Sequence, residues 1–219
     1  MRESVITAIQ AEKLIAILRR PEKETLLPAV RALVKGGLRL IEITFDRSGK
    51  WTKEDTCSAI SALRNEFGET LFVGAGTVLT EEEVTLAHSA GAQFIVSPDC
   101  DPKVVAKTKS LGMVSIPAAF TPTEIALALK SGADFIKLFP AGELSDGYLK
   151  MVKAPLSDAK LLAVGGVTKE NAAKFISLGF DGVGVGGALY DERLVKARDW
   201  EGLFAQAKTF IDSLTRRIV

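Results

Sequence analysis

The sequence is poor in the residues on which several common kinds of site depend. Among its 219 residues there is one histidine, His88, and there are two cysteines, Cys57 and Cys100. Two cysteines outside a C-x-x-C pattern support neither a disulfide framework nor a thiolate metal site. His88 falls inside a helical pattern, where we expect it at the surface. The usual serine or cysteine triads therefore have no base, and we expect no metal site.

An excess of one charge and long hydrophobic runs are also lacking. The 28 Lys and Arg residues balance 27 Asp and Glu residues, which gives no reason to expect nucleic acid or an anionic membrane as a partner. No apolar run reaches the ~18 residues that a membrane span needs, and the first residues lack the apolar core of a signal peptide. We therefore expect a cytoplasmic protein.

Short apolar runs alternate with helical patterns along the whole chain. The predicted strands are 14–18, 40–45, 71–73, 93–96, 113–116, 134–140, 160–164 and 183–185. Helices are predicted at 24–35, 53–67, 81–90, 168–178 and 200–216, and two more begin at Pro102 and Pro122. Strands of near-continuous apolar character are typical of a parallel sheet covered on both faces.

Eight βα units in a chain of this length predict a (β/α)8 TIM barrel. We expect residues 1–219 to form a single barrel domain of the α/β class, with a short N-terminal helix. An open doubly wound sheet is the competing fold. No G-x-G-x-x-G opens a helix after the first strand, which counts against a dinucleotide-binding version of that fold.

Lys137 lies inside a predicted strand, between Ile136 and Leu138. Burial disfavours an ammonium group and lowers its pKa. A neutral amine near pH 7 can attack a carbonyl and form a Schiff base. The alternative is a lysine near the strand end with its head in water.

Glu42 is the second charged residue inside a predicted strand, enclosed by Ile41 and Ile43. The active site of such a barrel lies at the C-terminal ends of its strands. Two opposite charges in one barrel interior need each other or a substrate, because an unpaired buried ion is strongly unfavourable. A structural ion pair with Lys137 is the alternative; the position of both residues favours a site.

Two glycine clusters follow the last two predicted strands, at 165–166 and 184–187. Barrels that bind phosphate commonly use these two loops, through backbone N–H groups and a short helix N-terminus. Glycines that only form tight turns are the alternative.

Three more residues belong to the same end of the predicted barrel. Arg19 could pair with a substrate carboxylate, Thr77 offers a hydroxyl, and Phe139 packs either over the site or in the core. Together these parts describe a Schiff-base aldolase. Lys137 would condense with a ketone, and Glu42 would move the protons.

These motifs are familiar as a set, over about Leu14 to Tyr190. The sequence resembles the family of 2-keto-3-deoxy-6-phosphogluconate (KDPG) aldolases, which includes 4-hydroxy-2-oxoglutarate (KHG) and 2-keto-3-deoxy-6-phosphogalactonate (KDPGal) aldolases. The segments that carry the resemblance are 15–19, 41–44, 73–78, 94–98, 121–124, 136–140 and 164–167. The resemblance implies a metal-free class I aldolase without a cofactor, usually trimeric, with a keto-acid sugar phosphate as its ligand. Its products would be pyruvate and glyceraldehyde 3-phosphate, in carbohydrate metabolism of the Entner–Doudoroff kind.

The resemblance also implies roles for individual residues. Lys137 would form the Schiff base and Glu42 would be the general acid/base, while Arg19 and Thr77 would hold the substrate carboxylate. The pocket would be lined by Pro98, Pro117, Phe139 and Val164, and the phosphate would be bound by Gly165, Gly166, Gly186 and Gly187.

The chain departs from the family pattern at several of these places. Val164 replaces a common threonine, as in the galactonate-specific branch, and Gly187 replaces a phosphate-binding serine. A common arginine after the second strand is Asp46, with Arg47 next to it, so Arg19 must supply the carboxylate contact.

Pro117 is followed by two alanines where glycine is usual, which narrows the pocket. The departures leave the substrate open between the gluconate and galactonate types and 4-hydroxy-2-oxoglutarate. A phosphate-binding isomerase or epimerase and a non-catalytic sugar-phosphate-binding barrel remain as alternatives in other functional classes.

Overall fold

The computed structural model describes residues 1–215, and in it nine strands form one parallel sheet in the order β5-β4-β3-β2-β1-β9-β8-β7-β6. The strands are β1 (Leu14–Arg19), β2 (Leu40–Thr44), β3 (Phe72–Gly76), β4 (Phe94–Val96), β5 (Val114–Ile116), β6 (Ala118–Ala119), β7 (Ile136–Leu138), β8 (Leu161–Val164) and β9 (Gly182–Val185). The α-helices are α1 (Arg2–Glu12), α2 (Lys23–Lys35), α3 (Lys53–Phe67), α4 (Glu81–Ser89), α5 (Pro102–Ser110), α6 (Pro122–Lys130), α7 (Asp146–Lys153), α8 (Ala172–Ser177), α9 (Glu192–Lys196) and α10 (Trp200–Thr215), with a 3₁₀ turn at η1 (Ala141–Glu143). The predicted helix end at Arg216 lies outside the described residues.

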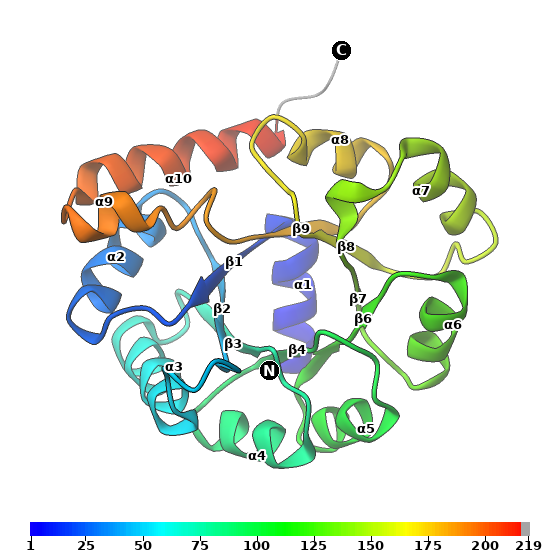
Figure 1. Ribbon diagram of the computed structural model, residues 1–219, viewed down its shortest axis with the longest axis horizontal. Coiled ribbons are helices and arrows are strands. Elements are labelled where there is room, and N and C mark those ends of the chain that lie inside the picture. The colour runs from blue at the N-terminus through cyan, green and yellow to red at the C-terminus, as the bar shows by residue number, and fades with distance from the viewer. Residues whose placement is uncertain (216–219) are drawn as a thin grey trace.

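The sheet closes on itself at Pro117. Strands β5 and β6 are two parts of one extended stretch, which bonds to β4 on one side and to β7 on the other. The Ser97 N–H donates to the Ile116 carbonyl (3.1 Å), and the Lys137 N–H donates to the Pro117 carbonyl (2.9 Å). Proline has no N–H, so one ladder hydrogen bond is missing at Pro117. The bonds to the Ile116 and Pro117 carbonyls keep the sheet closed. The predicted (β/α)8 barrel is confirmed, and the strand predicted to stop at Pro117 continues as β6 (Figure 1).

Helix α1, the short N-terminal helix that the sequence predicted, lies across the middle of the ring of strands in Figure 1. Its Val5 and Ile9 are fully buried in the apolar cluster that fills the barrel interior. The strand residues in this cluster are Ile15, Ile17, Leu40, Phe94, Val96, Val114, Ile116, Phe135, Leu162 and Val164. The helix therefore plugs the barrel, and most of the interior is packed rather than open.

The cluster identifies which alternate strand residues face inward. Leu40 and Phe135 belong to the interior, whereas Ile41 and Ile136 belong to the layer between the strands and the outer helices. Glu42 follows Leu40 by two residues, and Lys137 follows Phe135 by two residues. Both therefore lie on the inward face of their strands.

Strand β3 extends further than predicted. The sequence placed its end at Val73 because glycine is unfavourable in strands, but Gly74 and Gly76 both lie within it. Each makes room for a large interior neighbour: a Cβ on Gly74 would lie 2.3 Å from the Phe94 ring.

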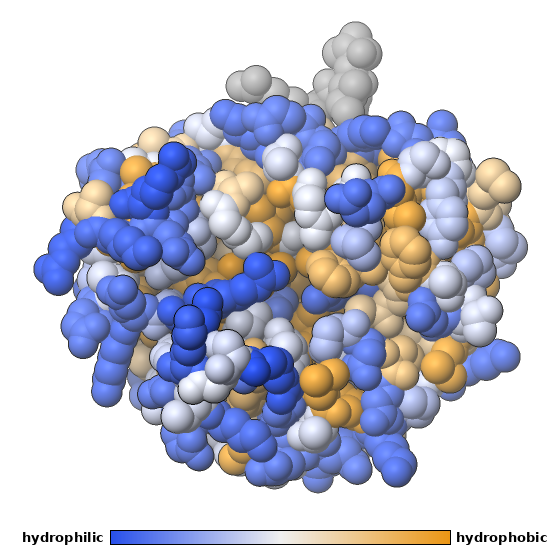
Figure 2. Space-filling view, viewed as in Figure 1, coloured by the Kyte–Doolittle hydropathy of each residue, from blue (hydrophilic) through white to orange (hydrophobic). Residues whose placement is uncertain are grey.

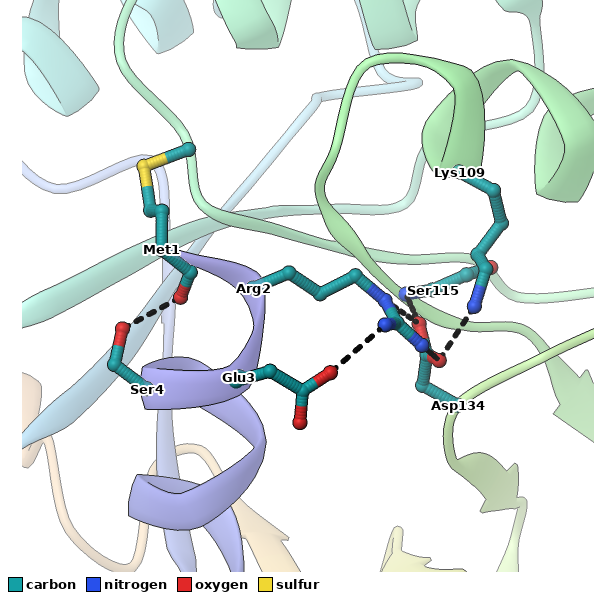
Figure 3. A network of polar contacts seen from close by, with 7 residues as sticks. All are labelled: Met1, Arg2, Glu3, Ser4, Lys109, Ser115 and Asp134. Carbon is teal, nitrogen blue, oxygen red and sulfur yellow. Dashed lines mark hydrogen bonds and ion pairs between the residues drawn. The ribbon is translucent and has the colours of Figure 1, made fainter.

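A buried carboxylate fastens α1 to the barrel (Figure 3). The Asp134 side chain is 5% exposed and pairs with Arg2 of α1 and with Lys109 of α5 (2.6 Å). It also accepts a hydrogen bond from the Ser115 N–H in β5 (3.0 Å). Since Asp134 comes three residues before Lys137, this network fixes the start of the strand that carries the lysine. No helix within residues 1–215 is long and apolar enough to cross a membrane.

Candidate active site

Lys137 points into the barrel interior from β7. Its residue is 9% exposed, and its ammonium nitrogen lies 4.8 Å from the centroid of the Phe139 ring. Burial lowers the pKa of Lys137, and Arg19 lowers it further, while the charge of Glu42 acts in the opposite direction. The geometry therefore favours an amine that loses its proton below the ordinary lysine pKa.

Glu42 points into the same interior from β2 and is 3% exposed. Burial raises its pKa, against the opposing influence of Lys137 and Arg19. Within residues 1–215, no hydrogen bond or ion pair shorter than 4 Å joins Glu42 to Lys137 or to another side chain. The structural ion pair considered as the alternative is thus not formed as a direct contact, and the carboxyl group is available to exchange protons.

Arg19 ends β1 and is exposed. It lies on the inward face of β1, because Ile15 and Ile17 belong to the interior cluster. Its charge acts on both Glu42 and Lys137. The structure therefore brings the two predicted catalytic residues and the predicted carboxylate-binding arginine to one end of the barrel.

The predicted pocket residues take different positions. Pro98 and Phe139 line a cavity of about 350 Å³ together with Ala118 and Ala119. Pro117 is buried, and its carbonyl holds the Lys137 backbone instead. The methyl groups of Ala118 and Ala119, where glycine is usual in the family, therefore lie in the wall of that cavity.

Val164 ends β8 inside the barrel and is 6% exposed. It packs closely against Gly184 of β9, where an added Cβ would lie 2.8 Å from Val164 Cγ2. At this buried position valine has a methyl group where threonine would have a hydroxyl.

The two glycine loops lie beside each other because β8 and β9 are paired. Gly165 (φ 85°) and Gly166 (φ 73°) take left-handed conformations, and a Cβ on Gly165 would lie 2.9 Å from the Phe139 ring. In the part of the chain that the structure describes, no hydrogen bond engages the backbone N–H groups of Gly166 and Gly187.

Beyond Gly187 the chain forms a single turn. The N–H groups of Leu189 and Tyr190 donate to the Gly186 carbonyl, at 2.9 and 3.0 Å. The loops therefore offer free backbone donors next to Phe139, in an arrangement suited to an anion.

Thr77 follows β3 directly and has a left-handed backbone (φ 57°). Its carbonyl accepts a hydrogen bond from Arg47 (2.6 Å), which also forms a two-point ion pair with Glu83. Thr80 and Glu83 have the sequence spacing of a helix capping box. Only half of that box is present, because the Glu83 carboxylate binds Arg47 and the Leu79 N–H (2.9 Å). Arg47 and Glu83 thus pair beside Thr77, and the capping pattern in the sequence did not indicate this pairing.

Asp46, at the position of the common family arginine, organises the loop after β2. It accepts hydrogen bonds from the Ser48 hydroxyl (2.6 Å) and from the N–H groups of Lys50 (2.9 Å) and Trp51 (3.2 Å). These contacts lower the pKa of Asp46 to about 2. Asp46 is therefore a loop-forming residue.

The surface around this ring of elements is mixed. In the view of Figure 2, hydrophilic residues cover most of the periphery, and hydrophobic residues reach the surface in patches nearer the middle. The exposed large apolar residues include Phe120, Leu127 and Phe139, which line the same cavity as Pro98.

A (β/α)8 barrel with a buried lysine and a buried carboxyl group on its inner face defines the class of protein: a lyase, specifically a class I aldolase. The sequence model of the KDPG and KHG aldolases matches residues 5–206. The chain belongs to this family.

Known relatives and solved structures agree with this assignment. The chain is 38% identical to the 2-dehydro-3-deoxy-6-phosphogalactonate aldolase of Escherichia coli, over 81% of this chain and 84% of that protein. It is 35% identical to the 2-dehydro-3-deoxy-phosphogluconate aldolase of Treponema pallidum, over 80% of each. A solved structure described as native KDPGal superposes with a TM-score of 0.81 at 36% identity, covering 91% of this chain and 93% of that one.

Proposed function

We propose that this aldolase cleaves a 2-keto-3-deoxy-6-phospho-sugar acid, of the phosphogalactonate or phosphogluconate type, into pyruvate and glyceraldehyde 3-phosphate. The observation that carries the proposal is Lys137, a buried amine with a lowered pKa that shares the barrel interior with Glu42. An amine of this kind attacks the C2 ketone. Loss of water from the resulting carbinolamine gives an iminium ion.

The iminium withdraws electrons from the C3–C4 bond. That bond breaks as the C4 hydroxyl gives its proton to Glu42, so the aldehyde leaves and an enamine remains on Lys137. Protonation of the enamine at C3 and hydrolysis of the imine release pyruvate and the free amine. The raised pKa of Glu42 suits a group that must both accept and return a proton.

The two ends of the substrate have separate binding groups in this proposal. Arg19 and Thr77 hold the carboxylate, and the N–H groups of the loops at 165–166 and 186–187 bind the phosphate. Val164, buried at the end of β8, bears in this proposal on the configuration that is accepted at C4 or C5. Because Gly187 offers only a backbone donor, 4-hydroxy-2-oxoglutarate, which lacks phosphate, is the second candidate substrate.

Borohydride reduction in the presence of pyruvate tests the chemistry. We expect an irreversible pyruvyl mass increase on Lys137, and none in Lys137→Arg. Cleavage coupled to lactate dehydrogenase then compares the two phospho-sugar acids and 4-hydroxy-2-oxoglutarate. Well-folded protein that gives no adduct would refute the proposal.

We further propose that the enzyme is a cytoplasmic homotrimer. The exposed Phe120 and Leu127 form an apolar surface of the kind that another subunit covers, and the unpaired Cys57 and Cys100 suit a reducing compartment. Light scattering of the wild type and of Leu127→Glu tests the assembly. A wild type that is monomeric at micromolar concentration contradicts it.

A further inference from the structure

The guanidinium of Arg47 bridges two loops at the end of the barrel where the substrate carboxylate is proposed to bind. Its Nη1 donates to Glu83 Oε1 (2.8 Å), and its Nη2 donates to Glu83 Oε2 (2.7 Å) and to the Thr77 carbonyl (2.6 Å). Arg47 comes from the loop after β2, whereas Glu83 belongs to the first turn of α4. One side chain therefore ties together the segments that follow two neighbouring strands.

Glu83 is a rigid anchor for this arginine. The Glu83 side chain is 1% exposed, and it also accepts a hydrogen bond from the Leu79 N–H (2.9 Å). Burial raises the pKa of Glu83, but its hydrogen bonds with Arg47 and Leu79 outweigh that effect and hold it below its usual value. A buried, ionised carboxylate with two fixed oxygens leaves the guanidinium one orientation.

Thr77 needs such support, because a β-branched residue is strained in the left-handed region. The peptide group after Thr77 is held at both ends: its carbonyl by Arg47, and its N–H, that of Val78, by the Val96 carbonyl (3.3 Å). No hydrogen bond among the described residues engages the hydroxyl or the N–H of Thr77. Both groups are available to a ligand, and the backbone that carries them is fixed.

We propose that Arg47 is a positioning residue: paired with Glu83, it holds Thr77 in the conformation that binds the substrate carboxylate. The inference rests on the carboxylate subsite of the proposed function. It also separates two arginines by role. The charge of Arg47 is neutralised by Glu83, so Arg19 is the cation that meets the substrate.

The test is the pyruvate dependence of borohydride trapping in Arg47→Lys. A lysine can reach Glu83 or the Thr77 carbonyl but lacks the fork that binds both. We expect the half-saturating pyruvate concentration to rise about tenfold, with the trapping rate at saturation within about twofold of wild type. The matched control is Arg31→Lys, which alters an Arg–Glu pair between helices, Arg31 with Glu66, and should leave the curve unchanged.

The outcomes separate this inference from the proposed function. Wild-type protein that pyruvate and borohydride do not modify refutes the proposed function itself. Normal wild-type trapping with an unchanged half-saturation in Arg47→Lys, or with equal losses in both parameters, overturns the positioning role. If Arg47→Lys fails to fold, Glu83→Gln decides, because it keeps the side-chain shape and removes one arm of the pair. An unchanged half-saturation in that variant also overturns the role.

Discussion

The carboxylate of Glu42 occupies the space that a side chain on Gly76 would fill. A Cβ built on Gly76 would lie 1.7 Å from Glu42 Oε1. The residues belong to the paired strands β2 and β3. The place of the acid/base residue therefore depends on the absence of a side chain on the neighbouring strand.

Gly76→Ala should displace Glu42 and slow catalysis. A misplacement of about 1 Å at a catalytic group lowers rates by about 100-fold, which is the fall in kcat that we expect from steady-state assays. Gly147→Ala is the control, since its added Cβ would meet only Ser145 Oγ at 3.9 Å, and it should retain wild-type kcat. A folded Gly76→Ala enzyme with normal kcat would show that Glu42 does not act from this position.

The pH dependence of trapping should report the coupling between Lys137 and Glu42. Only the neutral amine reacts, so the trapping rate rises with pH through the lowered pKa of Lys137. The negative charge of Glu42 favours the ammonium form, so Glu42→Gln should move the midpoint of this rise to lower pH. Arg19→Met should move it to higher pH.

Glu82→Gln removes a surface carboxylate paired with Lys53 and should not move the midpoint. Shifts of the same sign in the Glu42 and Arg19 variants would contradict the electrostatic account. The measurement is the initial rate of adduct formation by mass spectrometry, at saturating pyruvate across the pH range.

Val164→Thr should change substrate preference. The substitution exchanges a methyl group for a hydroxyl inside the barrel with little change in volume. We expect the ratio of kcat/KM values to shift towards the gluconate-derived substrate by about tenfold, the scale of one hydrogen bond to a substrate hydroxyl. Val164→Ala removes volume without adding a hydroxyl. It therefore separates the effect of side-chain volume from the effect of the hydroxyl. An unchanged ratio in Val164→Thr would remove Val164 from the list of specificity determinants.

Asp134→Asn should destabilise the protein in a pH-dependent way. Burial raises the pKa of Asp134, but hydrogen bonds from Arg2, Lys109 and the Ser115 N–H outweigh it and hold the pKa below the ordinary value of 3.8. A lowered folded-state pKa stabilises the folded protein above the unfolded-state pKa, and this contribution is lost as the pH falls through the folded-state pKa.

At pH 7 the variant should lose about 3 kcal/mol of unfolding free energy in urea, as expected when one partner of a buried pair is removed. The difference from wild type should shrink as the pH falls below 3.8. Asp158→Asn, at an exposed residue lining the same cavity as Arg2, should change stability by less than about 0.5 kcal/mol. A loss in Asp134→Asn that is constant from neutral to acid pH would assign the effect to packing.

The barrel and the inward placement of Lys137 and Glu42 were predictable, because period-two alternation decides which side of a strand faces inward. Leu40 and Phe135 define the inner face, and Glu42 and Lys137 follow each at two residues. Local rules were less reliable where one side chain had two possible partners. Thr80 and Glu83 form a valid capping pattern, yet Arg47 is a stronger partner for the Glu83 carboxylate.

Other features depended on contacts that only the closed barrel creates. Gly74 and Gly76 predict a loop by local propensity, but in the barrel they are strand residues facing Phe94 and Glu42. The Arg47–Glu83 pair joins residues 36 apart in sequence, and no periodicity links them. The roles given to Lys137, Glu42, Arg19, Thr77 and the glycine loops are predictions.

The seam at Pro117 has a consequence for how the protein behaves in a crowded solution. A strand at the open edge of a sheet presents unpaired N–H and C=O groups, which can template association with another chain. Here both ends of the sheet meet in the stretch 114–119, which is bonded to β4 and to β7. Local opening of that seam would expose two unpaired strand edges at once. In the folded enzyme the stretch 114–119 therefore keeps both of these strand edges paired.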